Sequence, residues 1–184
     1  MNWEEIPGWF TKYDAEAYTK ILERIPDGGS LVEVGCYVGK SLCSQAEIIK
    51  KKHLHVLAVD LFKGEGVYKD VFALVPPDEM FQYFEKHMRA FGLEPTTFKG
   101  QSTEAAKLDI MADAIFIDAD HSYDGVRKDL LAWWPHLKHG GSIGGHDYYD
   151  QGGYGLCCAV NFFPGFAGRK IITQDMCTVW EVVK

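Results

Sequence analysis

Short apolar segments alternate along this chain with longer segments whose apolar residues recur at helical spacing. The segments at 30–35 (SLVEVG), 53–62 (HLHVLAVDLF) and 112–118 (ADAIFID) are rich in β-branched residues and have the length of buried strands. Helical patterns at 39–52 and 122–137 follow the first and the last of them. Strands that alternate with helices form a parallel sheet with helices on both faces. The alternation therefore predicts a doubly wound α/β fold.

The rest of the chain completes this pattern. A weak strand is expected at 95–100 and another strand at 140–148, with helices at 77–92 and 102–108. The last residues, RKIITQDMCTVWEVVK, are typical of two strands joined by a tight turn at QD. Such a hairpin would place an antiparallel strand in an otherwise parallel sheet. We expect one domain over residues 1–184, beginning with an N-terminal extension of 27 residues that contains a helix.

Composition narrows the choice of partner. The formal net charge is −7, which argues against DNA or RNA because an acidic protein is repelled by phosphates. No apolar run approaches the ~18 residues of a membrane helix, and the acidic N-terminus differs from a signal peptide. The five cysteines form an odd set without zinc-type spacing, which predicts reduced thiols and a cytoplasmic location. We therefore expect a small-molecule substrate, with neither nucleic acid nor membrane as partner.

Polar residues follow four of the predicted strands. They are Glu33 with Gly35, Asp60, the group Asp118, Asp120 and His121, and the pair His146 and Asp147. The carboxyl ends of parallel strands meet at one edge of the sheet, and ligands of such folds bind beyond that edge. Four polar strand ends at the same edge indicate a binding site.

The first of these strand ends is a glycine-bearing turn into a helix. Gly35 allows a ligand to approach the backbone closely, and the following helix offers free N–H groups. The spacing to Gly39 matches neither the dinucleotide pattern G-x-G-x-x-G nor the phosphate loop G-x-x-x-x-G-K. Asp60 lies at the end of the second strand, where a carboxylate accepts hydrogen bonds from ribose hydroxyls. Together these residues favour an adenosine-containing cofactor.

The segments LVEVGCYVGKS, VLAVD, GQSTEAA and FIDADHSYDGVRKDLLAWWPHLKHGGSIGGHDY together resemble the class I S-adenosylmethionine-dependent methyltransferases. The likeness spans roughly residues 28–183 and is greatest to the small branch related to metal-dependent O-methyltransferases of catechols and macrolide sugars. It implies a Rossmann-like, mostly parallel sheet of about seven strands with an antiparallel C-terminal hairpin. It also implies S-adenosylmethionine as the cofactor. The implied cofactor-binding residues are Glu33, Gly35, Tyr37, Gly39 and Ser41 for the methionine part, Asp60 for the ribose, Gln101 and Ser102 for the adenine, and Asp118.

The same resemblance suggests a role for the acids and histidines. Asp118 and Asp147 would share a divalent metal ion, Mg²⁺ or Mn²⁺, that lowers the pKa of the substrate hydroxyl. His121 would take the proton of that hydroxyl as the catalytic base. Related sugar methyltransferases carry an acid where this chain has His146. As a third metal ligand, His146 would suit Mn²⁺, Fe²⁺ or Zn²⁺ at least as well as Mg²⁺, or else the metal has been lost. Asp120 is expected to cap the helix that begins at Ser122.

The substrate pocket and two other functions are left open by the sequence. The long connection at 62–80, the aromatic segment at 148–166, the N-terminal residues 2–14 or a second subunit of a homodimer would have to form the pocket. One alternative is a module that binds the adenosine cofactor without transferring a methyl group. The other is a nicotinamide-dependent oxidoreductase, which the glycine spacing and the antiparallel tail disfavour.

Overall fold

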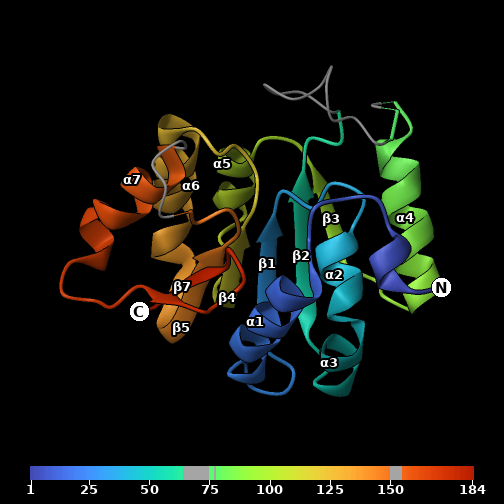
Figure 1. Cartoon of the computed structure of the whole chain (residues 1–184), viewed down its shortest axis with the longest axis horizontal. Coiled ribbons are helices and arrows are strands. Elements are labelled where there is room, and N and C mark those ends of the chain that lie inside the picture. Colours follow the sequence, from blue (N-terminus) through green and yellow to red (C-terminus); the bar gives the residue numbers. More distant parts are fainter. Residues whose placement is uncertain (64–74, 77, 150–154) are drawn as a thin grey trace.

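A seven-stranded sheet lies at the centre of the molecule in the computed structural model, which describes residues 1–63, 75–76, 78–149 and 155–184 (Figure 1). The strands are β1 (Ser30–Val34), β2 (His55–Asp60), β3 (Thr96–Lys99), β4 (Ala112–Ile117), β5 (Leu137–Gly145), β6 (Ile172–Thr173) and β7 (Trp180–Val183). Their order is β3-β2-β1-β4-β5-β7-β6. The pairs among β1 to β5 are parallel, whereas β7 is antiparallel to both β5 and β6. The predicted Rossmann-like fold with its antiparallel C-terminal hairpin is confirmed.

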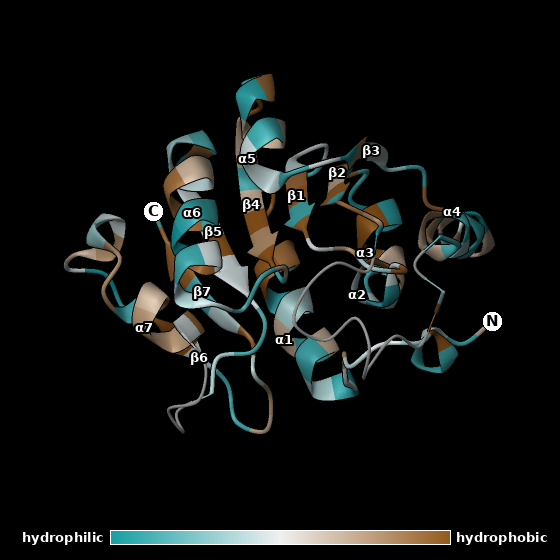
Figure 2. Cartoon of the chain, turned by 90° about the horizontal axis from the view of Figure 1, so that it is seen from above, coloured by the Kyte–Doolittle hydropathy of each residue, from teal (hydrophilic) through white to brown (hydrophobic). Residues whose placement is uncertain are grey.

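Helices cover both faces of this sheet, as the view from above shows (Figure 2). The helices are α1 (Lys12–Glu23), α2 (Lys40–Ser44), α3 (Ala46–Lys51), α4 (Met80–Phe91), α5 (Ser102–Ala105), α6 (Tyr123–Trp133) and α7 (Gly155–Asn161). Short 3-10 helices are found at Trp3–Glu5, Ala106–Leu108, Trp134–His136 and Pro164–Phe166. One core lies between the sheet and α1 to α4, and the other lies between the sheet and α5 to α7.

Alternation along the strands divides the side chains between these two cores. In β1, Leu31 points into the core under α1 to α4, while Val32 and Val34 point into the opposite core. In β4, Phe116 and Ile117 are divided in the same way. Successive side chains of a strand face opposite sides of a sheet, so a strand that is covered on both faces must be apolar throughout. This explains the unbroken apolar segments of the sequence.

Two local expectations were wrong. The helix expected at 39–52 is divided into α2 and α3 at Gln45, whose side chain is buried. Its amide donates to the Ala15 carbonyl at 3.0 Å, and its oxygen accepts from the Thr19 hydroxyl at 2.8 Å. These bonds to α1 stabilise the interruption. The expected tight turn between β6 and β7 is in fact a connection over residues 174–179.

The N-terminal segment is bound to the sheet at several points. Lys40, at the start of α2, donates from its ammonium group to the carbonyls of Glu4 and Gly8, at 3.2 and 3.0 Å. Helix α1 is bound to the C-terminal hairpin by the contacts Lys20–Gln174 and Arg24–Glu181. These contacts hold the N-terminal segment against α2 and against the C-terminal hairpin. No helix in the described ranges is long and apolar enough to span a membrane.

Candidate active site

The turn after β1 is packed directly against the end of β4. Gly35 has a φ of 87°, and its N–H donates to the Val59 carbonyl at 2.8 Å. A Cβ atom on Gly35 would lie 2.0 Å from the carbonyl oxygen of Asp118. Only glycine fits this close approach and this backbone conformation. The predicted glycine turn therefore brings the cofactor loop and the acidic end of β4 together.

Asp60 is fixed at the end of β2 by backbone donors. Its Oδ2 accepts from the N–H of Tyr37, and its Oδ1 accepts from the N–H of Phe62, both at 2.7 Å. Burial raises the pKa of this carboxyl, and the backbone hydrogen bonds oppose that rise. Each carboxylate oxygen has lone pairs beyond the one used here. Asp60 can therefore still accept hydrogen bonds from a ribose, and that role stays a prediction.

Glu33 and Ser41, both expected to surround the methionine part of the cofactor, lie inside the protein. Glu33 is fully buried and accepts hydrogen bonds from the hydroxyls of Tyr18 and Ser41, at 2.9 and 2.6 Å. Burial raises the pKa of Glu33 to about 8, and the two hydroxyl donors only partly oppose it. This carboxyl joins β1 to α1 and α2. Gly39, with a φ of 86°, begins α2 beside it, while Tyr37 is half-buried.

The two residues expected near the adenine differ in exposure. Gln101 is exposed at the start of α5, whereas the Ser102 hydroxyl accepts a hydrogen bond from Trp133 Nε1 at 2.8 Å. Asp129 of α6 lies beside Ser102. Burial raises the pKa of Asp129 to about 6, although the hydrogen bond from Ser102 acts to lower it. The Ser102 side chain therefore joins α5 to α6. Contact of either residue with an adenine stays a prediction.

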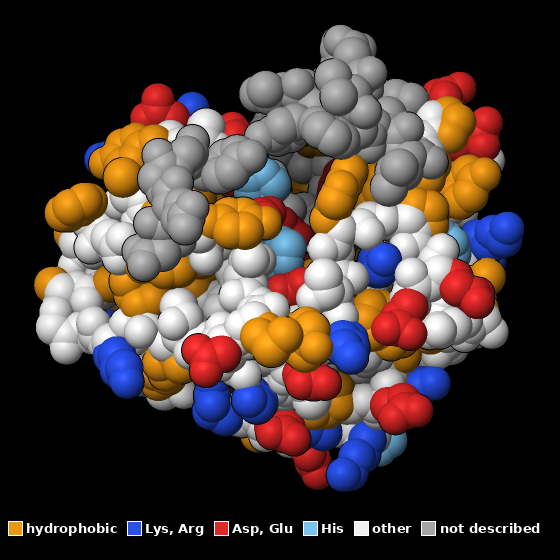
Figure 3. Space-filling model, viewed as in Figure 1, with side chains coloured by type: hydrophobic (Ala, Val, Ile, Leu, Met, Phe, Trp, Pro, Cys, Tyr) orange, Lys and Arg blue, Asp and Glu red, His pale blue; other side chains and the backbone are white. Residues whose placement is uncertain are grey.

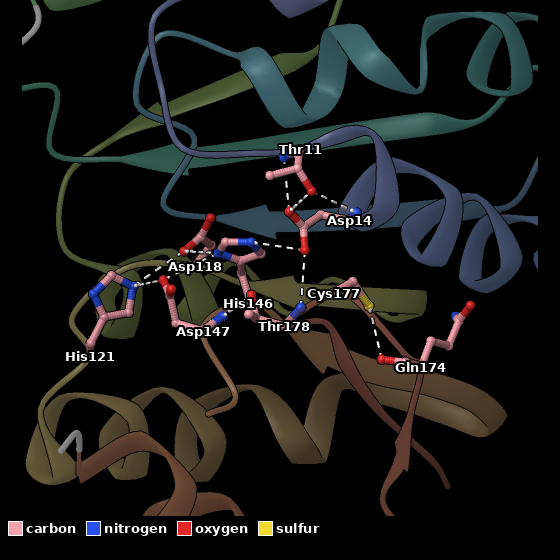
Figure 4. Close-up of polar contacts among 9 residues, drawn as sticks. All are labelled: Thr11, Asp14, Asp118, His121, His146, Asp147, Gln174, Cys177 and Thr178. Carbon is pink, nitrogen blue, oxygen red and sulfur yellow. Dashed lines mark hydrogen bonds and ion pairs between the residues drawn. The ribbon is translucent and has the colours of Figure 1, made fainter. Parts of the chain in front are cut away.

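Asp118, His121 and Asp147 converge at the ends of β4 and β5 (Figure 4). His121 Nε2 lies 2.9 Å from Asp147 Oδ2 and 3.3 Å from Asp118 Oδ1. One ligand atom from each of the three residues lies within 4.8 Å of the other two. The three side chains are between 22% and 26% exposed, so the cluster is open to a ligand. Figure 3 shows histidine and acidic side chains together in a hollow of this face.

His146 lies behind this cluster in a buried position. Its Nδ1 is 3.2 Å from Asp147 Oδ2 and 4.0 Å from Asp118 Oδ1. Its Nε2 is 3.3 Å from Asp14 Oδ1. This distance is that of an ion pair, but the contact does not have the geometry of a hydrogen bond. Asp14, which comes from α1, was not identified from the sequence. Its signal was the pattern T-x-x-D at 11–14, because Thr11 and Asp14 form the capping box of that helix.

Opposite charges determine the ionisation of this cluster. Burial lowers the pKa of His121, but the contacts with Asp118 and Asp147 outweigh it and raise that pKa to about 10. In the same way, Asp118, Asp14 and Asp147 overcome burial and raise the pKa of His146 to about 11. Burial raises the pKa of Asp147, whereas the two histidines lower it further than burial raises it. Acidic and imidazole side chains therefore alternate at this edge of the sheet.

Asp120 has a different role from the one expected. The N-cap of α6 is Ser122, whose hydroxyl accepts from the N–H of Gly125 at 3.1 Å. Asp120 accepts from the N–H of Ser122 at 2.8 Å and so stabilises the turn before the helix. A short side chain two residues before the N-cap reaches the N–H of the N-cap residue itself. The expectation that Asp120 caps the helix was wrong.

A family model described as a methyltransferase domain matches residues 32–148, more than half of the chain and the part that carries this site. The chain belongs to this methyltransferase family. The resemblance to class I S-adenosylmethionine-dependent methyltransferases is thereby confirmed. Among curated proteins, none matches this methyltransferase at a significant level.

Solved structures of other methyltransferases share its fold. The O-methyltransferase NovP has a TM-score of 0.69 at 16% identity, over 92% of this chain and 78% of NovP. CalS11, a TDP-rhamnose 3'-O-methyltransferase of calicheamicin biosynthesis, has a TM-score of 0.65 at 14% identity, over 95% of this chain and 81% of CalS11. A precorrin-6y C5,15-methyltransferase from Geobacter metallireducens has a TM-score of 0.69 at 12% identity, over 98% of this chain and 95% of that protein. At these identities the likeness shows the fold alone, and the acceptor atom has to be argued from the site.

Proposed function

We propose that this methyltransferase transfers a methyl group from S-adenosylmethionine to a hydroxyl of a small molecule, with a divalent cation bound at the end of β4. The observation that carries the proposal is the convergence of Asp118, His121 and Asp147, whose ligand atoms lie within 4.8 Å of one another. Transfer from a sulfonium to oxygen requires an ionised or nearly ionised hydroxyl that is held in line with the methyl group. A cluster of oxygen and imidazole ligands beside the cofactor turn is suited to that task.

The cofactor would lie across the ends of β1 and β2. Gly35 leaves the backbone accessible there, and Asp60 presents a carboxylate that is already oriented by two N–H groups. Tyr37 follows in the same turn, and Gln101 is exposed after β3. The sulfonium would then lie near Asp118, because Asp118 contacts the Gly35 turn through its backbone.

The residues of the cluster fit a divalent cation. Asp118 and Asp147 would hold it through hard carboxylate oxygens. A bound cation would lower the pKa of the acceptor hydroxyl and balance the charge of its oxyanion. Two carboxylates without a cation would repel each other, and here two histidines separate them.

His121 is the side chain best placed to accept the proton of the acceptor hydroxyl. It is more exposed than His146 and directly precedes Ser122, the N-cap of α6. A general base acts best when its pKa lies near the working pH. The pKa of His121 is raised to about 10 by Asp118 and Asp147, despite the opposing effect of burial. A divalent cation bound to these two carboxylates would offset their negative charge and bring the pKa of His121 back toward neutrality.

A small hydroxylated molecule is the acceptor that the surroundings favour. Exposed Tyr123 and Tyr149 lie close in sequence to the cluster and would pack against an apolar or ring-shaped body. NovP and CalS11, which share the fold, are named as O-methyltransferases. The predicted pocket segment at 62–80 lies largely outside the described residues, and the one at 148–166 is described only at 148–149 and 155–166.

Calorimetric titration would test this proposal. The chelator-treated protein would be titrated with S-adenosylhomocysteine, with and without Mg²⁺ or Mn²⁺, and then with each metal alone. We expect binding of the cofactor product and of one cation. Cofactor binding without a cation would refute the metal-assisted step and favour a module that binds the cofactor without transfer. A lack of cofactor binding would refute the proposal altogether.

A further inference from the structure

Asp14 reaches the active site from α1, although it is remote in sequence from every other residue there (Figure 4). It is 3% exposed, and its two carboxylate oxygens have separate partners. Oδ2 accepts from the backbone N–H and the hydroxyl of Thr11, at 2.8 and 2.6 Å. Oδ1 accepts from the N–H of Thr178 at 3.1 Å and faces His146 Nε2 at 3.3 Å. The capping box of α1 therefore uses one oxygen, and the other oxygen faces the active site.

His146 connects Asp14 to Asp147. The imidazole has a carboxylate oxygen at each of its two nitrogens, Asp14 at Nε2 and Asp147 at Nδ1. The ring therefore lies between two carboxylates, with one close contact on each side. Phe10 packs against it with ring centroids 5.3 Å apart, which fixes the imidazole from the side.

Asp147 requires such support because its backbone is in an unusual conformation. Its φ is 61°, the left-handed region that non-glycine residues adopt at a cost of about 1–3 kcal/mol. Its N–H donates to the hydroxyl of Thr178 at 3.2 Å, while its carboxylate contacts His146. Asp14 Oδ1 contacts both of these supports, at the N–H of Thr178 and at the ring of His146.

We propose that Asp14 is a positioning residue of the active site, which holds Thr178 and His146 and through them fixes the Asp147 carboxylate opposite Asp118. His146 is then the connecting group, Asp118 and Asp147 hold the cation, and His121 is left to accept the proton of the acceptor hydroxyl. The inference rests on the proposed function, because Asp147 is one of the two carboxylates expected to bind the cation. Removing an outer partner of a metal ligand typically weakens metal binding about 10- to 100-fold.

Mn²⁺ titration, followed by electron paramagnetic resonance, tests the inference on the full chain. Asp14→Asn should weaken Mn²⁺ binding about 10- to 100-fold. Asp113→Asn is the matched control, because Asp113 also accepts from a backbone N–H (Ser30) and pairs with a cation (Lys138), at the opposite edge of the sheet. It should leave Mn²⁺ binding unchanged. Folded Asp14→Asn with wild-type affinity would overturn the inference alone, whereas wild-type protein without Mn²⁺ binding would overturn the proposed metal site and the inference with it.

A double-mutant cycle tests the route through His146. His146→Gln should weaken Mn²⁺ binding, and Asp14→Asn should add little in that background, whereas independent, additive losses would contradict the route. The imidazole ¹H–¹⁵N signals that His146→Gln lacks should shift in Asp14→Asn and stay in place in Asp113→Asn. If the Asp14→Asn variant fails to fold, the His146→Gln variant tests the inference by itself, because that substitution leaves the capping box of Thr11 and Asp14 intact. Unchanged Mn²⁺ binding in His146→Gln would overturn the inference.

Discussion

Two aspartates at opposite ends of β4 have different surroundings. Asp113, at the amino end, accepts from the N–H of Ser30 and from the ammonium group of Lys138, both at 2.8 Å. Asp118, which follows the carboxyl end, lies beside two histidines, and a second carboxylate, that of Asp147, belongs to the same cluster. The first carboxylate has one neutral donor and one cation from neighbouring strands. The second shares its positive partners with another acid.

The difference indicates how to recognise a functional acid in this fold. An acid with fixed donors from adjacent strands stabilises the sheet, and nothing about it requires a ligand. Two acids at one strand edge repel each other, and a chain accepts that cost where the charges serve a ligand or a reaction. Four substitutions sharpen or break this comparison, from the largest expected effect to the smallest.

Gly35→Ala should have the largest effect, because it forces the carboxyl edge apart. The added Cβ would lie 2.0 Å from the Asp118 carbonyl oxygen, on a backbone with a φ of 87°. We expect a loss of about 3 kcal/mol or more in the free energy of unfolding, together with loss of S-adenosylhomocysteine binding. Urea unfolding and calorimetry measure the two effects. Gly140→Ala is the control, since Gly140 has a φ of 78° but open space at its Cβ, and it should cost only about 1 kcal/mol.

Asp118→Asn should separate the cation from the cofactor. The amide keeps the shape of the side chain but loses the charge, so Mn²⁺ affinity should fall about 100-fold or more while S-adenosylhomocysteine affinity changes little. Asp120→Asn, in the neighbouring exposed turn, should leave both affinities unchanged. An equal loss of cofactor affinity in Asp118→Asn would contradict the division of tasks between the two halves of the edge.

Asp60→Asn should show the opposite pattern. Charge-assisted hydrogen bonds contribute about 1.5–3 kcal/mol each, so S-adenosylhomocysteine affinity should fall roughly 10- to 100-fold. Mn²⁺ affinity should stay at the wild-type value, because the Asp60 oxygens accept hydrogen bonds from the N–H groups of Tyr37 and Phe62, on the cofactor side of the edge. Calorimetry with each ligand separately measures both. A parallel loss of Mn²⁺ binding would mean that the two halves of the edge act as one site.

Glu33→Gln extends the comparison to an acid that accepts hydrogen bonds from two neutral hydroxyls. Burial raises the pKa of Glu33 from 4.5 to about 8 in the folded protein, so folding takes up a proton between these values. Stability is full below the unfolded pKa and falls as pH rises through this window. Glu33→Gln should remove this loss, so that its stability relative to wild type increases by up to about 1.4 kcal/mol per pH unit there. Urea unfolding at several pH values measures the slope, and the exposed Glu47→Gln should show none.

The sheet was predictable because its strands are buried on both faces. Unbroken apolar segments such as 112–118 are confined to strands in that setting, and their polar ends marked the carboxyl edge. The break at Gln45 was not predictable, because it depends on tertiary hydrogen bonds to Ala15 and Thr19 that leave no periodic pattern. The length of the last connection was missed for a similar reason, since Thr178 is held by Asp14.

The candidate site was predictable only in part. Asp118, Asp147 and His121 were identified because they are adjacent to strand ends, which topology brings together. The orientation of the two histidines is a matter of side-chain packing, and the sequence could not tell that His121 faces the cluster while His146 faces Asp14. Asp14 was missed because helix-capping residues are common and no local pattern relates α1 to β5.

The contacts of α1 with the C-terminal hairpin have a consequence for synthesis of the chain. Asp14 meets Thr178 across 164 residues, and Arg24 meets Glu181 across 157. A ribosome makes α1 well before these partners, and domains fold as their segments emerge. Until the hairpin has left the exit tunnel, the first helix cannot take its final place, and Asp147 lacks its support from Thr178. A nascent chain that has not yet reached Thr178 therefore lacks the contact through which Asp14 supports the active site.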